Sequence, residues 1–193
     1  MESPKDPQSK NKIRLLQLFV GWVLYPSGDL VGQLIMGNFS LPRVLVMMLA
    51  GGVVYRFEIP RWFAFIEKKR FKKDGNEKFP LFKYFVSEEV DGYKFNWLGK
   101  TISASIYFNP IWIFRHLLFI ALATTPFSDI VLGELLGNTI KIATISFFTN
   151  LPIAVAGNYI IQQKMSLKYR FLGSAVLTTI LNVKYAIEYV HFS

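Results

Sequence analysis

The sequence predicts an all-α protein of the membrane: a polytopic bundle of four to five transmembrane helices, some of them kinked. More than half of the 193 residues are hydrophobic, and they gather in long blocks without the period of two that is typical of strands. Each block exceeds the roughly 20 residues that a helix needs to cross a hydrocarbon core. Each also holds ionisable or strongly polar residues, which must face other helices, water or lipid headgroups. The blocks run over 13–36, 44–66, 97–123, 139–161 and 171–192.

The chain length suits one bundle rather than two domains. We assign residues 1–12 to a polar N-terminal tail and residues 13–193 to a single transmembrane helical domain. The chain has no cysteine and two histidines, so we expect neither disulfides nor a structural zinc site. It also lacks a serine nucleophile motif, a carboxylate pair at helical spacing and a glycine-rich phosphate loop. We therefore expect no enzymatic activity, no catalytic or metal-binding residues and no cofactor other than bound phospholipid.

The first block contains Pro26, which removes a backbone donor and predicts a kink. Asp29 and Gln33 follow it four residues apart, on one face of a helix that should point into the bundle. These two side chains either line a polar pathway or hydrogen-bond to a neighbouring helix and hold the first span in register.

The second block is apolar at its start and charged toward its end, where Arg56, Glu58 and Arg61 occur together. Arg56 and Glu58 are two residues apart and do not face each other on a regular helix. The group either forms a selectivity or voltage-sensing cluster or lies near the interface. In the interfacial arrangement, which we favour, Arg61 extends to the headgroups and the other two pair or bind lipid phosphate.

Residues 67–94 form a long polar connection that is rich in lysine and arginine and also contains several aromatic residues. This composition fits a short interfacial helix on the headgroups or a solvated loop equally well. A second basic turn covers residues 162–170. Both segments supply candidate contacts to lipid or to a partner: Lys68, Lys69, Arg70, Lys164 and Arg170.

Arg115 and His116 lie within the third block. Because imidazole titrates near neutrality, they form a candidate pH-responsive element, and a contact with cardiolipin or with a partner is an equal alternative. Asn158 and Asn182, in the fourth and fifth blocks, are candidate packing residues because their amides can bridge helices. The fifth block holds two charges and is the least apolar, which leaves the choice between four and five spans open.

The distribution of charge predicts an orientation. With five spans, the N-terminal tail, residues 67–94 and residues 162–170 fall on one side and are basic, whereas residues 124–138 are acidic. The positive-inside rule then places the N-terminus inside. The net charge of +9 suits contact with anionic lipid such as cardiolipin or with acidic partner subunits. Nucleic acid is not an expected partner, because the basic residues flank apolar blocks and form no separate basic domain.

Several spacings resemble those of the Mpv-seventeen/PMP-twenty-two family of small peroxisomal and mitochondrial membrane proteins. They are Gly28-Asp29 with Gln33, Arg43, Trp62-Phe63, Phe108-Asn109-Pro110, Pro152, Asn158-Tyr159, Tyr169-Arg170, Asn182 and Tyr185. The similarity extends over about residues 15–190. The chain is a divergent member if it belongs there, because four features of the family pattern differ. Leu151, Val155 and Leu181 replace a tryptophan, a glutamine and a tryptophan, and Arg56-Phe57 replaces a Gly-Pro pair.

Two functions remain in view. The first is a non-catalytic integral protein of the mitochondrial inner membrane, an accessory or structural subunit that binds lipid and docks against other membrane-protein subunits or itself. The lack of catalytic motifs, the 18 phenylalanines and the basic charge favour it. The second is a small-solute channel or transporter, which the family resemblance implies because relatives are described as channel-like. The resemblance also leaves the peroxisomal membrane as an alternative location.

Overall fold

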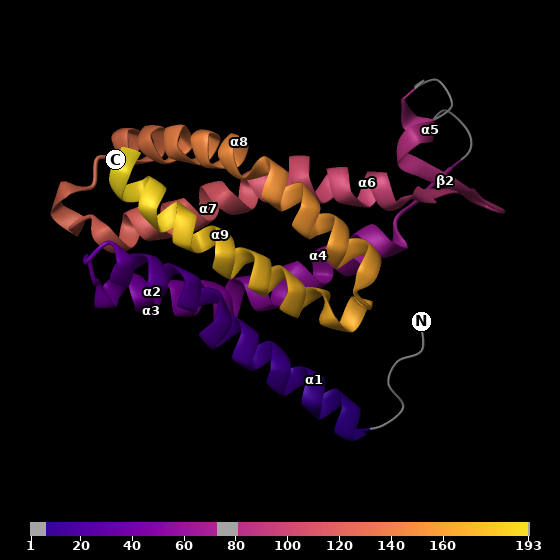
Figure 1. Cartoon of the computed structure of the whole chain (residues 1–193), viewed down its shortest axis with the longest axis horizontal. Coiled ribbons are helices and arrows are strands. Elements are labelled where there is room, and N and C mark those ends of the chain that lie inside the picture. Colours follow the sequence, from indigo (N-terminus) through magenta and orange to yellow (C-terminus); the bar gives the residue numbers. More distant parts are fainter. Residues whose placement is uncertain (1–6, 73–80, 193) are drawn as a thin grey trace.

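The computed structural model describes residues 7–72 and 81–192, which form a helical bundle with a small sheet at one end (Figure 1). Three long helical rods share one pattern: an α-helix passes into a π-helical segment and continues as a second α-helix. A π-helical segment widens the helix locally and is frequent at functional sites. The rods are α1 (Pro7–Phe19), η1 (Val20–Leu24) and α2 (Tyr25–Ile35); α3 (Leu41–Leu49), η2 (Ala50–Tyr55) and α4 (Arg56–Lys68); and α6 (Trp97–Ile102), η4 (Ser103–Phe108) and α7 (Asn109–Thr124).

Two single helices complete the bundle. They are α8 (Leu132–Lys164) and α9 (Arg170–Phe192), preceded by the 3₁₀ turns η5 (Phe127–Asp129) and η6 (Leu167–Tyr169). Three stretches are long and apolar enough to cross a membrane: Asn11–Ile35, Trp97–Thr124 and Leu132–Lys164. The predicted helical architecture is confirmed, and these three stretches fit a membrane protein.

The sheet corrects the prediction for residues 67–94. Their described part includes an antiparallel sheet of order β1-β3-β2 beside one short helix, so the segment is not simply a loop or a helix and the protein is not purely α-helical. Residues 73–80 of the predicted loop lie outside the described chain. The bounds are β1 (Arg70–Phe71), α5 (Phe82–Phe85), β2 (Val86–Glu89) and β3 (Gly92–Phe95).

The aromatic residues of this segment explain the difference. Phe71 makes edge-to-face contacts with Phe82 and Phe95, with ring centroids 5.4 and 4.8 Å apart. The sequence assigned such rings to lipid headgroups, but here they form a small aromatic cluster of their own. Gly92 allows the hairpin between β2 and β3, because its φ of 144° disfavours a side chain.

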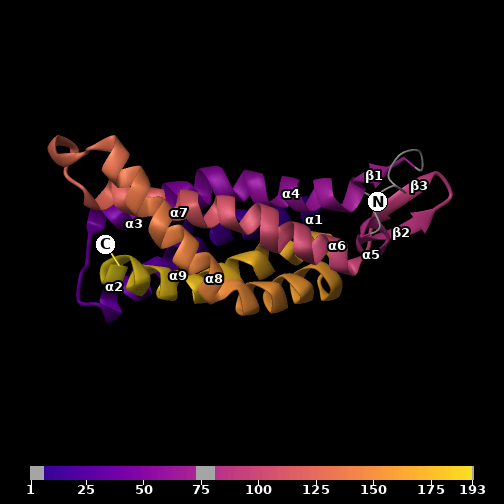
Figure 2. The same ribbon diagram turned by 90° about the horizontal axis from the view of Figure 1, so that it is seen from above.

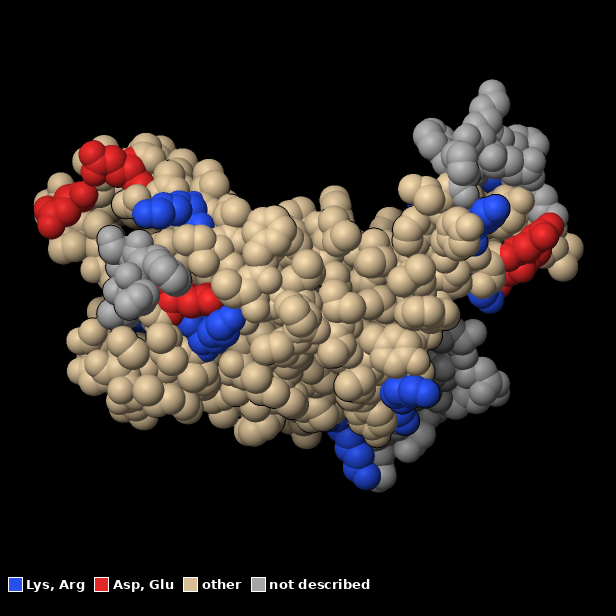
Figure 3. Space-filling model, turned by 45° about the horizontal axis from the view of Figure 1, so that its top comes forward, with Lys and Arg blue, Asp and Glu red and all other residues tan. Residues whose placement is uncertain are grey.

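The bundle has two distinct ends. Figures 1 and 2 place the sheet and the α8–α9 turn at one end, which we call the sheet end. The α2–α3 turn, the α7–α8 connection and the C-terminus lie at the opposite end. Figure 3 shows a wide uncharged middle, with lysine, arginine and carboxylate side chains gathered toward the ends.

The core is aromatic in the middle of the bundle. Tyr25 and Tyr55 are buried, with ring centroids 5.5 Å apart, and Tyr55 also contacts Trp112 at 5.4 Å. Tyr185 reaches the same cluster from α9. Four of the five helical rods thus meet in one aromatic core.

Candidate functional site

A buried cluster joins α2 to α3 near the opposite end. Asp29 is fully buried, and Arg43 donates to it from Nε, 3.0 Å from each carboxylate oxygen, and from Nη2, 2.5 Å from Oδ1. Gln33 Nε2 donates to Asp29 Oδ2 at 2.7 Å, and the Ser40 backbone N–H donates to Gln33 Oε1 at 2.8 Å. Sequence reasoning paired Asp29 with Gln33 but did not identify Arg43 as the partner that neutralises the carboxylate.

The three charged residues at 56–61 do not form a cluster. Glu58 turns to α7 and accepts from Arg115, with Nη1–Oε1 at 3.0 Å and Nη2–Oε2 at 2.5 Å. The guanidinium groups of Arg56 and Arg61 lie instead over the Phe57 ring, 5.0 and 5.8 Å from its centroid. Glu58 therefore pairs with Arg115 of α7 rather than with Arg56 or Arg61.

Arg115 and His116 also diverge, since Arg115 is half-buried beside Glu58 and His116 points into the core. The imidazole stacks on Trp112 at 4.8 Å and lies 6.1 Å from the Tyr185 ring. Within the described part of the chain, neither imidazole nitrogen has a hydrogen-bond partner. The imidazole thus packs as an aromatic member of the core.

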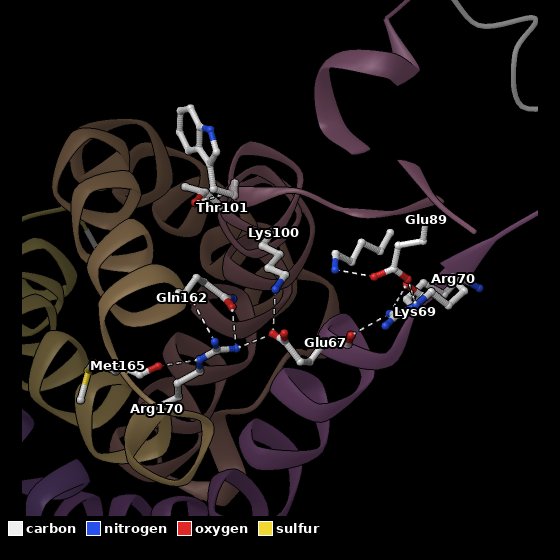
Figure 4. A network of polar contacts seen from close by, with 11 residues as sticks. Glu67, Lys69, Arg70, Glu89, Lys100, Thr101, Gln162, Met165 and Arg170 are labelled. Carbon is white, nitrogen blue, oxygen red and sulfur yellow. Dashed lines mark hydrogen bonds and ion pairs between the residues drawn. The ribbon is translucent and has the colours of Figure 1, made fainter. Parts of the chain in front are cut away.

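A network at the sheet end connects four helices (Figure 4). Glu67 Oε2, on α4, accepts from Lys100 Nζ of α6 at 2.8 Å and from Arg170 Nη1 of α9 at 2.9 Å. Arg170 also donates from Nη2 to the Gln162 carbonyl of α8 at 2.8 Å and from Nε to the Met165 carbonyl at 3.2 Å. Partial burial raises the pKa of the Glu67 carboxyl, but the hydrogen bonds and charges of Lys100 and Arg170 outweigh burial and lower that pKa.

This network corrects the assignment of Arg170 to lipid, because Arg170 is buried and holds α8, α9 and α4 together. Arg70 is exposed and forms an ion pair with Glu89 of the sheet at 2.7 Å. Lys68, Lys69 and Lys164 are exposed, as a contact with lipid or a partner requires. Lys69 Nζ lies 5.7 Å from both the Phe65 and the Phe71 ring centroids.

The two asparagines bridge helices. Asn158 Nδ2, on α8, donates to Ser105 Oγ of η4 at 3.4 Å, and Asn182 Nδ2, on α9, donates to the Tyr25 carbonyl of α2 at 3.3 Å. Glu188 makes a similar contact that sequence reasoning did not identify. This buried carboxylate accepts from Ser146 Oγ at 2.5 Å and from Thr149 Oγ1 at 2.8 Å, both on α8.

Two hollows differ in character. A cavity inside the bundle measures about 30 Å³ and is lined partly by polar side chains (Asn109, Asn158, Ser174, Thr178 and Tyr185). That volume suits an ordered water rather than a larger solute. An open groove of about 860 Å³ runs along the outside of α4, and we call it the α4 groove. Its lining is Val53, Val54, Phe57, Glu58, Arg61, Trp62, Phe65, Tyr107, Phe108 and Ile111.

Over residues 7–72 and 81–192, no group of three or more histidine, aspartate and glutamate side chains is close enough to hold a metal ion. The resemblance to the Mpv-seventeen/PMP-twenty-two family stays a prediction. Comparisons with protein-family models, with curated proteins and with solved structures find no match to this chain.

Proposed function

We propose that the protein is a non-catalytic integral membrane protein, a lipid-binding accessory or structural subunit of a larger assembly in the mitochondrial inner membrane. In this proposal five kinked spans cross the bilayer, with the sheet end on the basic side. The apolar block 44–66 lies within the second rod and α9 has 23 residues, and their lengths support a count of five spans. At about 1.5 Å per residue each exceeds a core about 30 Å thick.

One observation carries the proposal: the buried charged side chains of the described bundle pair with groups on neighbouring helices. Asp29 pairs with Arg43, and Glu67 pairs with Lys100 and Arg170. Such pairs cross-link helices and remove the penalty of a lone charge in hydrocarbon. The interior cavity holds little more than a water, whereas the α4 groove on the outside is large and apolar. This arrangement supports binding at the lipid-facing surface rather than passage of a solute.

Native-gel migration tests the proposal. The protein is solubilised in digitonin from its own membranes, and the band is analysed by mass spectrometry. We expect it to migrate with a large complex in fixed stoichiometry. Migration as a small homo-oligomer, with no other subunit in the band, would contradict the proposal. Fractionation of mitochondria from peroxisomes checks the location.

A second candidate is a small-solute channel, and the buried polar residues on several helices favour it. They include Gln33 on α2, Asn158 on α8 and Arg170 on α9. Recordings from the purified protein in planar bilayers test this candidate. Conductance that Asn158→Leu reduces would support it, because Asn158 lines the interior cavity. An electrically silent wild-type protein would rule it out.

A further inference from the structure

The α4 groove combines an apolar wall with a cation, Arg61, that has no anionic partner among the residues that the structure describes. Phe57, Arg61 and Phe65 follow one another at four-residue spacing on α4, so they share one face of the helix. The Arg61 side chain is exposed, and its contact in the described chain is the Phe57 ring. Glu58, the carboxylate in the groove, is engaged by two guanidinium nitrogens of Arg115. The Arg61 guanidinium is therefore the positive charge in the groove that an anionic ligand could neutralise.

We propose that the α4 groove binds one phospholipid with an anionic headgroup, with its phosphodiester on Arg61 and an acyl chain along the aromatic wall. The proposal rests on the proposed function and names the ligand of its lipid-binding surface. A guanidinium matches phosphate oxygens in charge and geometry, and charge-assisted hydrogen bonds are shorter and stronger than neutral ones.

The dimensions of the groove fit one leaflet. The helical wall extends from Val53 in η2 to Phe65 in α4, about 18 Å at roughly 1.5 Å per residue. Half of a hydrocarbon core is about 15 Å. The C-terminal end of α4 lies toward the sheet end, where Lys69 Nζ is 5.7 Å from the Phe65 ring centroid. From a phosphate on Arg61, an acyl chain directed away from the sheet end would reach Val53 after eight residues, about 12 Å at roughly 1.5 Å per residue, near the middle of the bilayer.

The part of the groove formed by η4 is aromatic, so it suits an apolar chain better than water. Tyr107 and Phe108 of η4 stack on Trp62 with ring centroids 5.6 and 5.0 Å apart and planes 22° apart in each case. This three-ring stack lines the groove together with Phe65, whose ring centroid lies 6.0 Å from that of Trp62. It also places a tryptophan, a fluorescent reporter, against the proposed acyl chain.

Native mass spectrometry of the full-length, lipid-depleted protein tests the proposal by titration with phosphatidylglycerol. We expect one tightly held lipid, and Arg61→Gln should weaken its binding by about tenfold, the effect of losing one charge-assisted hydrogen bond. Arg14→Gln is the matched control, because Arg14 is exposed on α1 and outside the groove. It should leave this affinity unchanged. Diacylglycerol, which lacks the phosphate, and glycerol phosphate, which lacks the chains, should both bind far more weakly.

Quenching by phosphatidylglycerol with brominated chains gives a second readout in the same protein. Bromine in the groove should quench Trp62, and Trp62→Phe should remove the quenched component while Trp22→Phe leaves it in place. Equal affinity in the Arg61→Gln variant, or equal binding of diacylglycerol, would overturn the proposal. Its failure is separable from that of the proposed function. A protein that binds no lipid but migrates with a large complex refutes only the groove, and lipid binding by a small homo-oligomer refutes only the subunit role.

Discussion

Asp29 and Arg43 form a buried ion pair across the α2–α3 turn, with three nitrogen–oxygen contacts of 2.5–3.0 Å. The side chain of Asp29 is 1% exposed and that of Arg43 is 5% exposed, so solvent screens neither charge. Gln33 and Ser40 extend the pair into a chain of hydrogen bonds that closes the turn between the first two rods. This cluster therefore holds α2 and α3 in a fixed relative position at the end of the bundle opposite the sheet.

Removing one member of this pair should destabilise the protein more than removing both. Arg43→Met leaves a buried carboxylate without a counter-charge, which costs about 3–5 kcal/mol in comparable pairs. The double variant with Asp29→Leu leaves no charge and should recover part of that loss. Thermal unfolding in detergent, followed by circular dichroism, measures both. A double variant as unstable as Arg43→Met would show that the carboxylate is not the source of the cost.

Gly28 permits the closest approach of α2 to α9. A Cβ atom at this position would lie 2.5 Å from the Thr179 carbonyl oxygen and 2.7 Å from its Cα. Because both neighbours are backbone atoms, Gly28→Ala must push the helices apart and should cost about 1–3 kcal/mol. Gly137→Ala is the matched control, since a Cβ there meets nothing within 4 Å. It should stabilise α8 by about 0.5–1 kcal/mol.

Unfolding of the two glycine variants in one detergent compares them directly. If Gly28→Ala left the free energy of unfolding unchanged, α2 and α9 would not approach each other as closely as described. Destabilisation by Gly137→Ala would show that the space beside Gly137 is occupied in the solubilised protein.

The local features of the fold follow from the sequence, and the pairings between helices do not. The apolar block 139–161 lies within α8 and the block 44–66 within the second rod, because burial of a long apolar run requires a helix in lipid. The sequence did not predict the small sheet, because its strands are only two to four residues long. Their pairing depends on a hairpin and on an aromatic cluster that joins distant residues.

The same limit applies to the candidate site. Helical spacing placed Asp29 beside Gln33, since residues four apart share a face. The pairing of Glu58 with Arg115 joins residues 57 positions apart, and that of Glu67 with Arg170 joins residues 103 apart. No periodicity encodes such separations. The assignment of Arg170 to lipid was wrong because a basic residue in a turn looks the same in sequence whether it faces water or a buried carbonyl.

Acid should weaken the sheet-end network through Glu67. The pKa of this carboxyl is lowered, because hydrogen bonds from Lys100 and Arg170 outweigh its partial burial. Its contribution to stability is therefore fully present above the pKa of an unfolded glutamate, about 4.3, and is lost as the pH falls through the folded pKa. We expect the unfolding temperature to fall below about pH 4.3 more steeply in the wild type than in Glu67→Gln.

Glu134→Gln is the control for the acid titration, because Glu134 is exposed at the opposite end of the bundle. It should leave the slope unchanged. Parallel curves for the wild type and Glu67→Gln would place the acid sensitivity elsewhere in the protein.

The proposed spans can be tested by thiol labelling, because the chain contains no cysteine of its own. Ser87 in β2, Ser166 in the α8–α9 turn and Ser128 in the α7–α8 connection are all exposed, so single cysteines there should not disturb packing. Five spans place Ser87→Cys and Ser166→Cys on one side of the membrane and Ser128→Cys on the other. A membrane-impermeant maleimide applied to sealed vesicles should label the first two together and the third only from the opposite face.

A cysteine appended after the last residue should share the side of Ser128 if α9 crosses, and the side of Ser166 if only four rods span. Labelling of all four positions from one face would contradict a spanning bundle altogether.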